Sequence, residues 1–209
     1  MINGTPELIA ARREEIINAC EQLYRTMDFR EVTLKEIGNI TSFSRPTIYN
    51  YFQTKEEIFL ALFEREYILW TEELHHINES LSKTDSEMLA EKIAESLEKR
   101  ILLLKLLSVN LYDVEGNSRM ERLVSFKKAY GRSRVELLNL FNTAYPGITE
   151  NEVNSLMFVF LPYLHGVYPY AFATDKQIEA MDEAEIEHPS FTVKGMVKSF
   201  LVRILPCKK

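Results

Sequence analysis

Apolar residues recur every three to four positions over long stretches of this chain, as expected for helices with one buried face. The first such stretch follows Pro6, which suits the first turn of a helix, and runs to Met27. A longer one begins at Lys55 and reaches Leu81 without an intervening Gly or Pro. The pattern predicts one helix for each stretch, and the second is long enough to connect two domains.

The second half of the chain carries further helical patterns and little else. Seven Gly and seven Pro among 209 residues, with abundant Leu, Ile and Glu, also favour an all-α fold. Pro162 and Pro169 are expected to kink or end the helix that contains them. The acidic segment 175–188 is expected to form an exposed short helix or loop. Helices are predicted from Asp85 through residue 114 in two parts, from Ser118 to Tyr145, from Thr149 to Tyr170 and over residues 192–205.

Three helix starts follow one another between residues 33 and 55, and the third of them begins the long second stretch. Thr33 and Glu36 have the spacing of a capping box, and so do Thr54 and Glu57. Between them Ser44 is a good N-cap, followed by a proline in the first turn. Two short helices cannot bury their faces alone, so they must pack on each other and on a third helix. This arrangement is a helix-turn-helix.

The second of these short helices has two different sides. Ile48, Tyr51 and Phe52 fall on one side and are expected to face the core. The opposite side is small, polar and aromatic, and no acidic residue interrupts it. Arg45 and Lys55 place positive charge at its two ends. Such a face suits the phosphate backbone and the base edges of DNA.

The same stretch resembles the signature of TetR-family transcriptional regulators. The resemblance rests on Ile37-Gly38 and on residues 43–58, and it covers about residues 8–63. Ser42 stands where the family usually has Gly, and Thr41 where it usually has Ala. If residue 42 needed a positive φ, Ser would be strained by about 1 kcal/mol.

The resemblance implies an N-terminal three-helix DNA-binding domain over residues 1–63 and a larger helical domain over residues 64–209 that binds an effector and forms a homodimer. From the angular sorting and the family motif, we expect Thr33, Tyr49 and Lys55 to contact phosphates. Arg45, Pro46, Thr47 and Asn50 are expected to approach bases. Lys35, Ser44 and Tyr51 complete the expected DNA-binding set.

Two sets of residues are expected to serve the second domain. An apolar or aromatic effector pocket is expected to be lined by Trp70, Leu74, Leu104, Leu107, Phe126, Phe158, Tyr163 and His165. The dimer contact is expected from segments that are apolar on every side, with Phe160, Leu164, Val167, Val193, Val197, Phe200, Leu201 and Ile204. The alternative for both sets is an internal core, because aromatic residues at helical spacing usually pack there.

Composition limits the other functions of the chain. The net charge of −6 argues against nonspecific binding of nucleic acid, so the DNA reading depends on the acid-free local face. Cys20 and Cys207 lie at opposite ends of the chain, which favours a reducing compartment. With no apolar run that spans a bilayer and no secretion signal, we expect a soluble, cytoplasmic protein without a membrane partner.

The sequence therefore predicts a ligand-responsive regulator, most simply a repressor, that binds a palindromic DNA operator as a dimer. The alternative is a helical small-molecule-binding or interaction protein whose helix-turn-helix serves packing only. His165 lies near two tyrosines, but no nucleophile, carboxylate pair or metal-ligand spacing accompanies it. We therefore expect no catalytic residue, no metal site and no cofactor.

Overall fold

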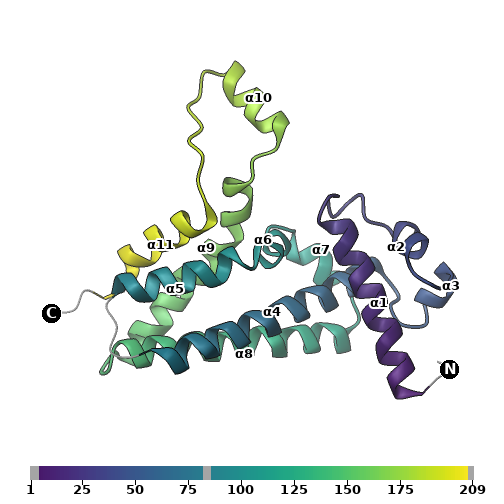
Figure 1. Cartoon of the computed structure of the whole chain (residues 1–209), viewed down its shortest axis with the longest axis horizontal. Helices are drawn as coiled ribbons and strands as arrows, with labels where there is room; N and C mark the ends of the chain where they lie inside the picture. Colours follow the sequence, from purple (N-terminus) through teal and green to yellow (C-terminus); the bar gives the residue numbers. More distant parts are fainter. Residues whose placement is uncertain (1–4, 82–85, 207–209) are drawn as a thin grey trace. The chain divides into compact units, whose positions relative to one another are not determined.

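The computed structural model describes residues 5–81 and 86–206, and it is all-helical over these ranges, as predicted (Figure 1). The expected cap Asp85 lies outside the described residues. The helices are α1 (Pro6–Tyr24), α2 (Leu34–Ile40), α3 (Arg45–Ile48), α4 (Lys55–Ser80), α5 (Ser86–Glu98), α6 (Ile101–Leu107), α7 (Leu111–Gly116), α8 (Met120–Ala144), α9 (Glu150–Ala171), α10 (Asp175–Glu183) and α11 (Val193–Ile204).

The chain divides into two compact units. Unit 1 contains Met1–Tyr67 together with Val109–Tyr130, and unit 2 contains Ile68–Ser108 together with Gly131–Lys209. The long helices α4 and α8 therefore each run through both units. This division groups α7 and the first turns of α8 with the helix-turn-helix.

Local capping explains most helix starts in unit 1. The Leu8 N–H donates to the Thr5 hydroxyl (3.3 Å), and the Glu36 N–H donates to the Thr33 hydroxyl (3.3 Å). Ser44 occupies the N-cap position of α3, but its side chain makes no capping hydrogen bond there. The predicted helix start at Ser118 is wrong. The Ser118 hydroxyl donates to the Val114 carbonyl (2.7 Å), and α8 begins at Met120.

The core of unit 1 joins the helix-turn-helix to α1 and α4. Phe59 of α4 is buried and receives Tyr24 and Phe29 edge-on, with ring centroids 5.0 and 4.6 Å apart. Gly38 of α2 lies against α3, where an added Cβ would meet the Arg45 Cβ at 3.4 Å. A side chain much larger than a methyl group at residue 38 would therefore push α3 away.

In unit 2, α11 packs against α5 and α9, and α6 packs against α9 and α5. Charged side chains line one edge of the α5–α11 contact: Lys194 pairs with Glu91 and Glu95, and Lys198 pairs with Glu91 and Glu87. These hydrogen bonds lower the pKa of Glu91 and raise the pKa values of both lysines. Glu87 and Glu95 are exposed and the other three groups are half-buried at the surface, so the pairs orient the helices more than they stabilise them.

Helix α9 begins with the predicted capping box. The Thr149 N–H donates to the Glu152 carboxylate (2.8 Å), and the Glu152 N–H donates to the Thr149 hydroxyl (3.3 Å). Pro162 and Pro169 both lie inside one continuous helix, which ends at Ala171, shortly after the second proline. Within the described ranges no single helix is long and apolar enough to cross a membrane, although the bent pair α9 and α10 meets that test by length and composition.

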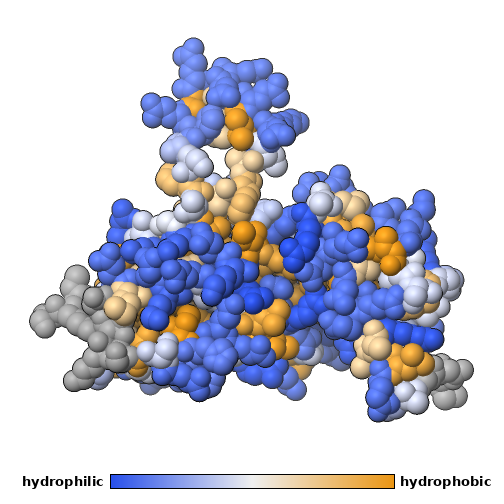
Figure 2. Space-filling model, in the orientation of Figure 1, coloured by the Kyte–Doolittle hydropathy of each residue, from blue (hydrophilic) through white to orange (hydrophobic). Residues whose placement is uncertain are grey.

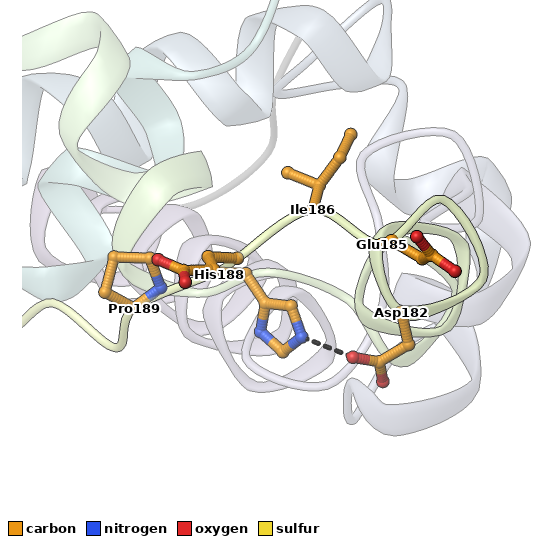
Figure 3. A pocket seen from close by; sticks show the side chains of 6 residues that line it. Asp182, Glu185, Ile186, His188 and Pro189 are labelled. Atoms are coloured by element: carbon orange, nitrogen blue, oxygen red, sulfur yellow. Dashed lines mark hydrogen bonds and ion pairs between the residues drawn. The ribbon is translucent and has the colours of Figure 1, made fainter.

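Residues 172–192 form an arm that leaves unit 2 at the end of α9 and returns at α11 (Figures 1 and 2). Its helix α10 is capped by Thr174 and Gln177 and has no buried residue. Six residues line a hollow of about 410 Å³ at the end of α10 and in the segment that follows it (Figure 3). They are Asp182, Glu185, Ile186, Glu187, His188 and Pro189. His188 Nε2 lies 2.7 Å from Asp182 Oδ1 and closes this turn of the arm. The predicted exposed short helix is therefore present.

Candidate functional site

The outer face of α3 is exposed, as a DNA-reading surface requires. Ser44, Arg45, Pro46, Tyr49 and Asn50 are all exposed. Thr33 and Lys35 of the preceding helix start are exposed as well, and Thr47 is half-buried. Ile48 on the opposite side is fully buried. The structure thus separates the polar and apolar sides of this short helix as the sequence sorted them.

Arg45 and Tyr49 form a pair on that face. The Arg45 Nη2 donates to the Tyr49 hydroxyl (3.1 Å), and the guanidinium lies 5.8 Å from the centre of the Tyr49 ring. The four-residue spacing places both on one side of the helix. Both side chains are exposed, so the pair holds a guanidinium ready for a phosphate or a base edge without burying its charge.

Lys55 and Tyr51 take inward positions. The Lys55 ammonium donates to the carbonyls of Phe29 (2.7 Å) and Val32 (3.2 Å) and lies 4.4 Å from the centre of the Phe29 ring. Only its third N–H is left for the expected phosphate contact. Tyr51 is buried, and its hydroxyl accepts from Arg12 (3.4 Å). Both residues therefore support the DNA-binding face from behind.

The turn between α2 and α3 is held by α1. Glu15 accepts from the backbone N–H of Ser42 and from its hydroxyl (3.0 Å for the latter). Of the non-glycine residues that the structure describes, only Glu185 has a positive φ, so Ser42 carries no left-handed strain. Ser at this position instead adds a hydrogen bond that Gly could not make.

A second feature of unit 1 escaped the sequence reading, namely the contact between the start of α4 and the start of α8. The Glu57 side chain is fully buried and forms a two-pronged ion pair with Arg119, with Nε to Oε1 at 2.6 Å and Nη2 to Oε2 at 2.8 Å. The backbone N–H groups of Gln53 (2.8 Å) and Arg119 (3.1 Å) donate to the same carboxylate. Glu57 thus accepts four hydrogen bonds.

These donors decide the charge state of Glu57. Burial alone would raise the pKa of its carboxyl, but the Arg119 guanidinium and the two backbone N–H groups outweigh burial and lower that pKa. The same pair raises the pKa of Arg119. Nearby, burial and the charges of Arg13 and Arg119 lower the pKa of Arg122. Glu57 is therefore an anion at neutral pH, held by the Arg119 guanidinium and two backbone N–H groups.

The residues expected to line an effector pocket belong to both units. Trp70, Leu74, Leu104 and Leu107 are buried in unit 2. The other four have different surroundings. Phe126 belongs to unit 1, where it packs near Phe63 and Tyr67, and Phe158 is 85% exposed. Tyr163 stacks on Phe200 with ring centroids 3.8 Å apart, and the His165 Nδ1 lies 2.8 Å from the Leu107 carbonyl.

A groove of about 350 Å³ lies beside Trp70, between α4 and α5. It is lined mainly by polar residues, which are Glu73, His76, Ser80, Lys92, Glu95, Ser96 and Lys99, together with Ile77. Ser96 joins the groove to the core, because its hydroxyl accepts from the Trp70 indole N–H (3.1 Å). No group of three His, Cys, Asp or Glu side chains with metal-binding geometry occurs among the residues described.

Most residues expected at the dimer contact are buried within one protomer. Phe160, Leu164, Val167, Val193, Val197 and Leu201 are at most 3% exposed, and Phe200 and Ile204 are half-buried. A partner cannot reach the buried six without opening the unit. They therefore form the core of unit 2, which was the alternative for this set.

A different side of the same helices is exposed and apolar. On α9 it consists of Phe158, Val159, Pro162, Pro169 and Tyr170, with half-buried Gly166 among them. On α11 it consists of the small residues Gly195, Ser199 and Val202. We call these nine residues the α9–α11 stripe. Periodicity could not separate the stripe from the core, because α9 is apolar on both sides.

Comparisons with known proteins cover nearly the whole chain. The family model described as "Bacterial regulatory proteins, tetR family" matches residues 16–62, and the model described as "Tetracyclin repressor-like, C-terminal domain" matches residues 64–205. The crystal structure of the MbdR regulator from Azoarcus sp. CIB is similar with a TM-score of 0.54 and 16% identity, over 94% of this chain and 98% of that chain. At this identity the likeness shows a shared fold alone. A search of curated proteins found no match.

Proposed function

Because this chain belongs to the TetR family of bacterial transcriptional regulators, we propose that it is a ligand-responsive repressor that binds a palindromic operator as a homodimer. The observation that carries the DNA-binding proposal is the exposed, acid-free outer face of α3 with its Arg45–Tyr49 pair. One helix of this kind covers a single visit to the major groove, so useful specificity requires two copies. Two-fold symmetry of the protein then implies a palindromic site.

The operator can be found by selecting duplexes from random DNA with the purified protein. Arg45→Ala should weaken binding to the selected duplex by about 1–3 kcal/mol and relax preference at one base position. Lys127→Ala is the matched control, since Lys127 is a basic residue of unit 1 that lies on α8 and pairs with Glu115 of α7 at 2.5 Å. If the protein selects no sequence, the alternative of a helical binding or interaction protein takes precedence.

The proposed dimer uses the α9–α11 stripe. Large apolar side chains that stand exposed on one protomer gain most from being covered by a second. Small residues on α11 would let the partner helix approach closely. Gly166 supports this choice, because a Cβ added there would meet no atom of its own protomer within 4 Å. The open space beside Gly166 is what a closely packed partner would fill.

The proposed effector is apolar or aromatic and binds in unit 2 near Trp70. Support comes from the large apolar side chains gathered there and from Ser96, which links Trp70 to the α4–α5 groove. Such a ligand releases DNA only if it binds the released conformation better. A typical coupling of about 1–3 kcal/mol would lower operator affinity roughly 5- to 150-fold.

Trp70 offers a direct test of this mechanism, since it is the only tryptophan. Its fluorescence can be titrated with apolar and aromatic compounds, with and without the selected operator. By reciprocity, the operator must weaken binding of the effector by the same factor by which the effector weakens binding of the operator. A ligand that binds tightly but is indifferent to operator would not be the effector.

A further inference from the structure

We propose that Glu57 is a positioning residue for DNA binding, which locks the segment after the recognition helix to the first turn of α8 through Arg119. The inference rests on the proposed DNA-binding function and names the residues through which unit 1 would receive an effector signal. Neither residue is expected to touch DNA. Their role follows from the hydrogen bonds that the Glu57 carboxylate accepts.

One carboxylate serves the starts of two helices. Its Oε2 accepts from the Gln53 N–H, just before α4, and its Oε1 accepts from the Arg119 N–H, just before α8. Free N–H groups at helix starts need an acceptor and favour a negative charge. Glu57 provides both to two helices whose capping segments lie more than sixty residues apart in sequence.

Further hydrogen bonds join the same two segments. The Thr54 hydroxyl donates to the Asn117 carbonyl (3.0 Å), and the Arg122 Nη2 donates to the Tyr51 carbonyl (3.2 Å). These two bonds and the Glu57–Arg119 pair all link residues 51–57 to residues 117–122. Because residues 51–57 directly follow Tyr49 and Asn50, this set of bonds fixes the chain immediately behind the DNA-binding face.

The Glu57–Arg119 pair can transmit a motion because separating it is costly. A small shift of the first turn of α8 must either carry residues 51–57 with it or separate Glu57 from Arg119. Separation leaves a buried carboxylate without its counter-charge, which is strongly unfavourable. Since α8 continues into unit 2, an effector that moves α8 acts on the recognition helix through this pair. Intact, the pair favours the DNA-binding conformation.

The test compares Glu57→Gln, Arg119→Gln and the double variant with wild type on the selected duplex. Each variant should bind roughly tenfold or more weakly, within the range of typical coupling. The slope of affinity against salt should stay unchanged, because no phosphate contact is lost. Arg119→Gln should bind most weakly, because it leaves the buried Glu57 carboxylate without its counter-charge, and the double variant should bind no more weakly than Arg119→Gln.

Hydrogen exchange gives a readout that needs no DNA. The amides of residues 50–54 should exchange faster in the variants, while those of α9 and α11 should not change. Lys127→Gln is the matched control, as it breaks the ion pair between Lys127 of α8 and Glu115 of α7. It should leave both affinity and exchange unaltered. If Glu57→Gln does not fold, Arg119→Lys, which keeps the charge but loses the two-pronged geometry, replaces it.

Unchanged operator affinity in folded variants would overturn the proposal. So would a salt slope reduced by about one for Arg119→Gln, because Arg119 would then itself contact a phosphate. Failure of the wild-type protein to select any DNA would instead overturn the proposed function. In that case faster exchange at residues 50–54 would still demonstrate that Glu57 and Arg119 hold this segment to the start of α8, and unchanged exchange would refute it.

Discussion

Replacing Phe158 by Ser should separate the proposed dimer without harming the protomer. The side chain is 85% exposed in one protomer, so its loss removes little of the protomer's core. Burying a phenylalanine that starts exposed stabilises by about 1.5–3 kcal/mol. Two-fold symmetry buries two copies, which gives about 3–6 kcal/mol per dimer. The dissociation constant of the dimer should therefore rise by a factor of roughly 10²–10⁴.

Sedimentation over a range of concentrations measures this change, and thermal unfolding checks that the protomer stays folded. Tyr112→Ser is the matched control, because Tyr112 is an aromatic residue that is 90% exposed but lies on α7, outside the α9–α11 stripe. Its replacement should leave the dimer intact. If Phe158→Ser dissociated no more readily than wild type, the reasoning that places the partner on the stripe would be refuted.

Three further predictions concern unit 1. Gly38→Ala should raise stability by about 0.5–1 kcal/mol in urea unfolding, because Ala favours the helix and its Cβ still fits at 3.4 Å from Arg45; a loss would show that α2 and α3 approach more closely. Lys55→Ala should lower the free energy of unfolding by about 1.5–3 kcal/mol, since two hydrogen bonds from a charged group are lost. If the same replacement lowered the slope of DNA affinity against salt by about one, Lys55 would contact a phosphate as well. Folding lowers the pKa of Glu57, so its contribution to stability is fully present above about pH 4.3 and is lost as the pH falls through the folded-state pKa. The difference in unfolding free energy between wild type and Glu57→Gln should therefore shrink as the pH falls below about 4.3. A difference that stays constant would contradict the lowered pKa of Glu57.

Features fixed by short-range chemistry could be predicted from the sequence. The caps at Thr33 and Thr149 depend on residues three positions apart, and both hydrogen bonds are present. The two sides of α3 follow from the angular spacing within a single turn or two, so Ile48 is buried and Pro46 is exposed, as the pattern indicated. Such predictions need no knowledge of distant partners.

Features that depend on distant partners could not be predicted. The spacing of Glu57 from Thr54 indicated a local capping box, and the Glu57 N–H does donate to the Thr54 hydroxyl (3.2 Å). The Glu57 carboxylate, however, binds Gln53 and Arg119, which the spacing could not reveal. Phe158 and Phe160 show a second limit, because they are the same residue type two positions apart, yet one is 85% and the other 0% exposed. In a helix that is apolar on all sides, periodicity does not indicate which side faces the partner.

The acidic net charge of the chain is compatible with DNA binding because of where its charges lie. In unit 1, Arg65 pairs with Glu14 and Glu21, and Arg119 pairs with Glu57. These carboxylates are neutralised by nearby cations instead of facing the duplex. Charges on more distant surfaces are screened over about 10 Å at an ionic strength of 0.1 M. The field that a phosphate meets at the α3 face is therefore set mainly by local groups such as Arg45, and the total of −6 says little about it.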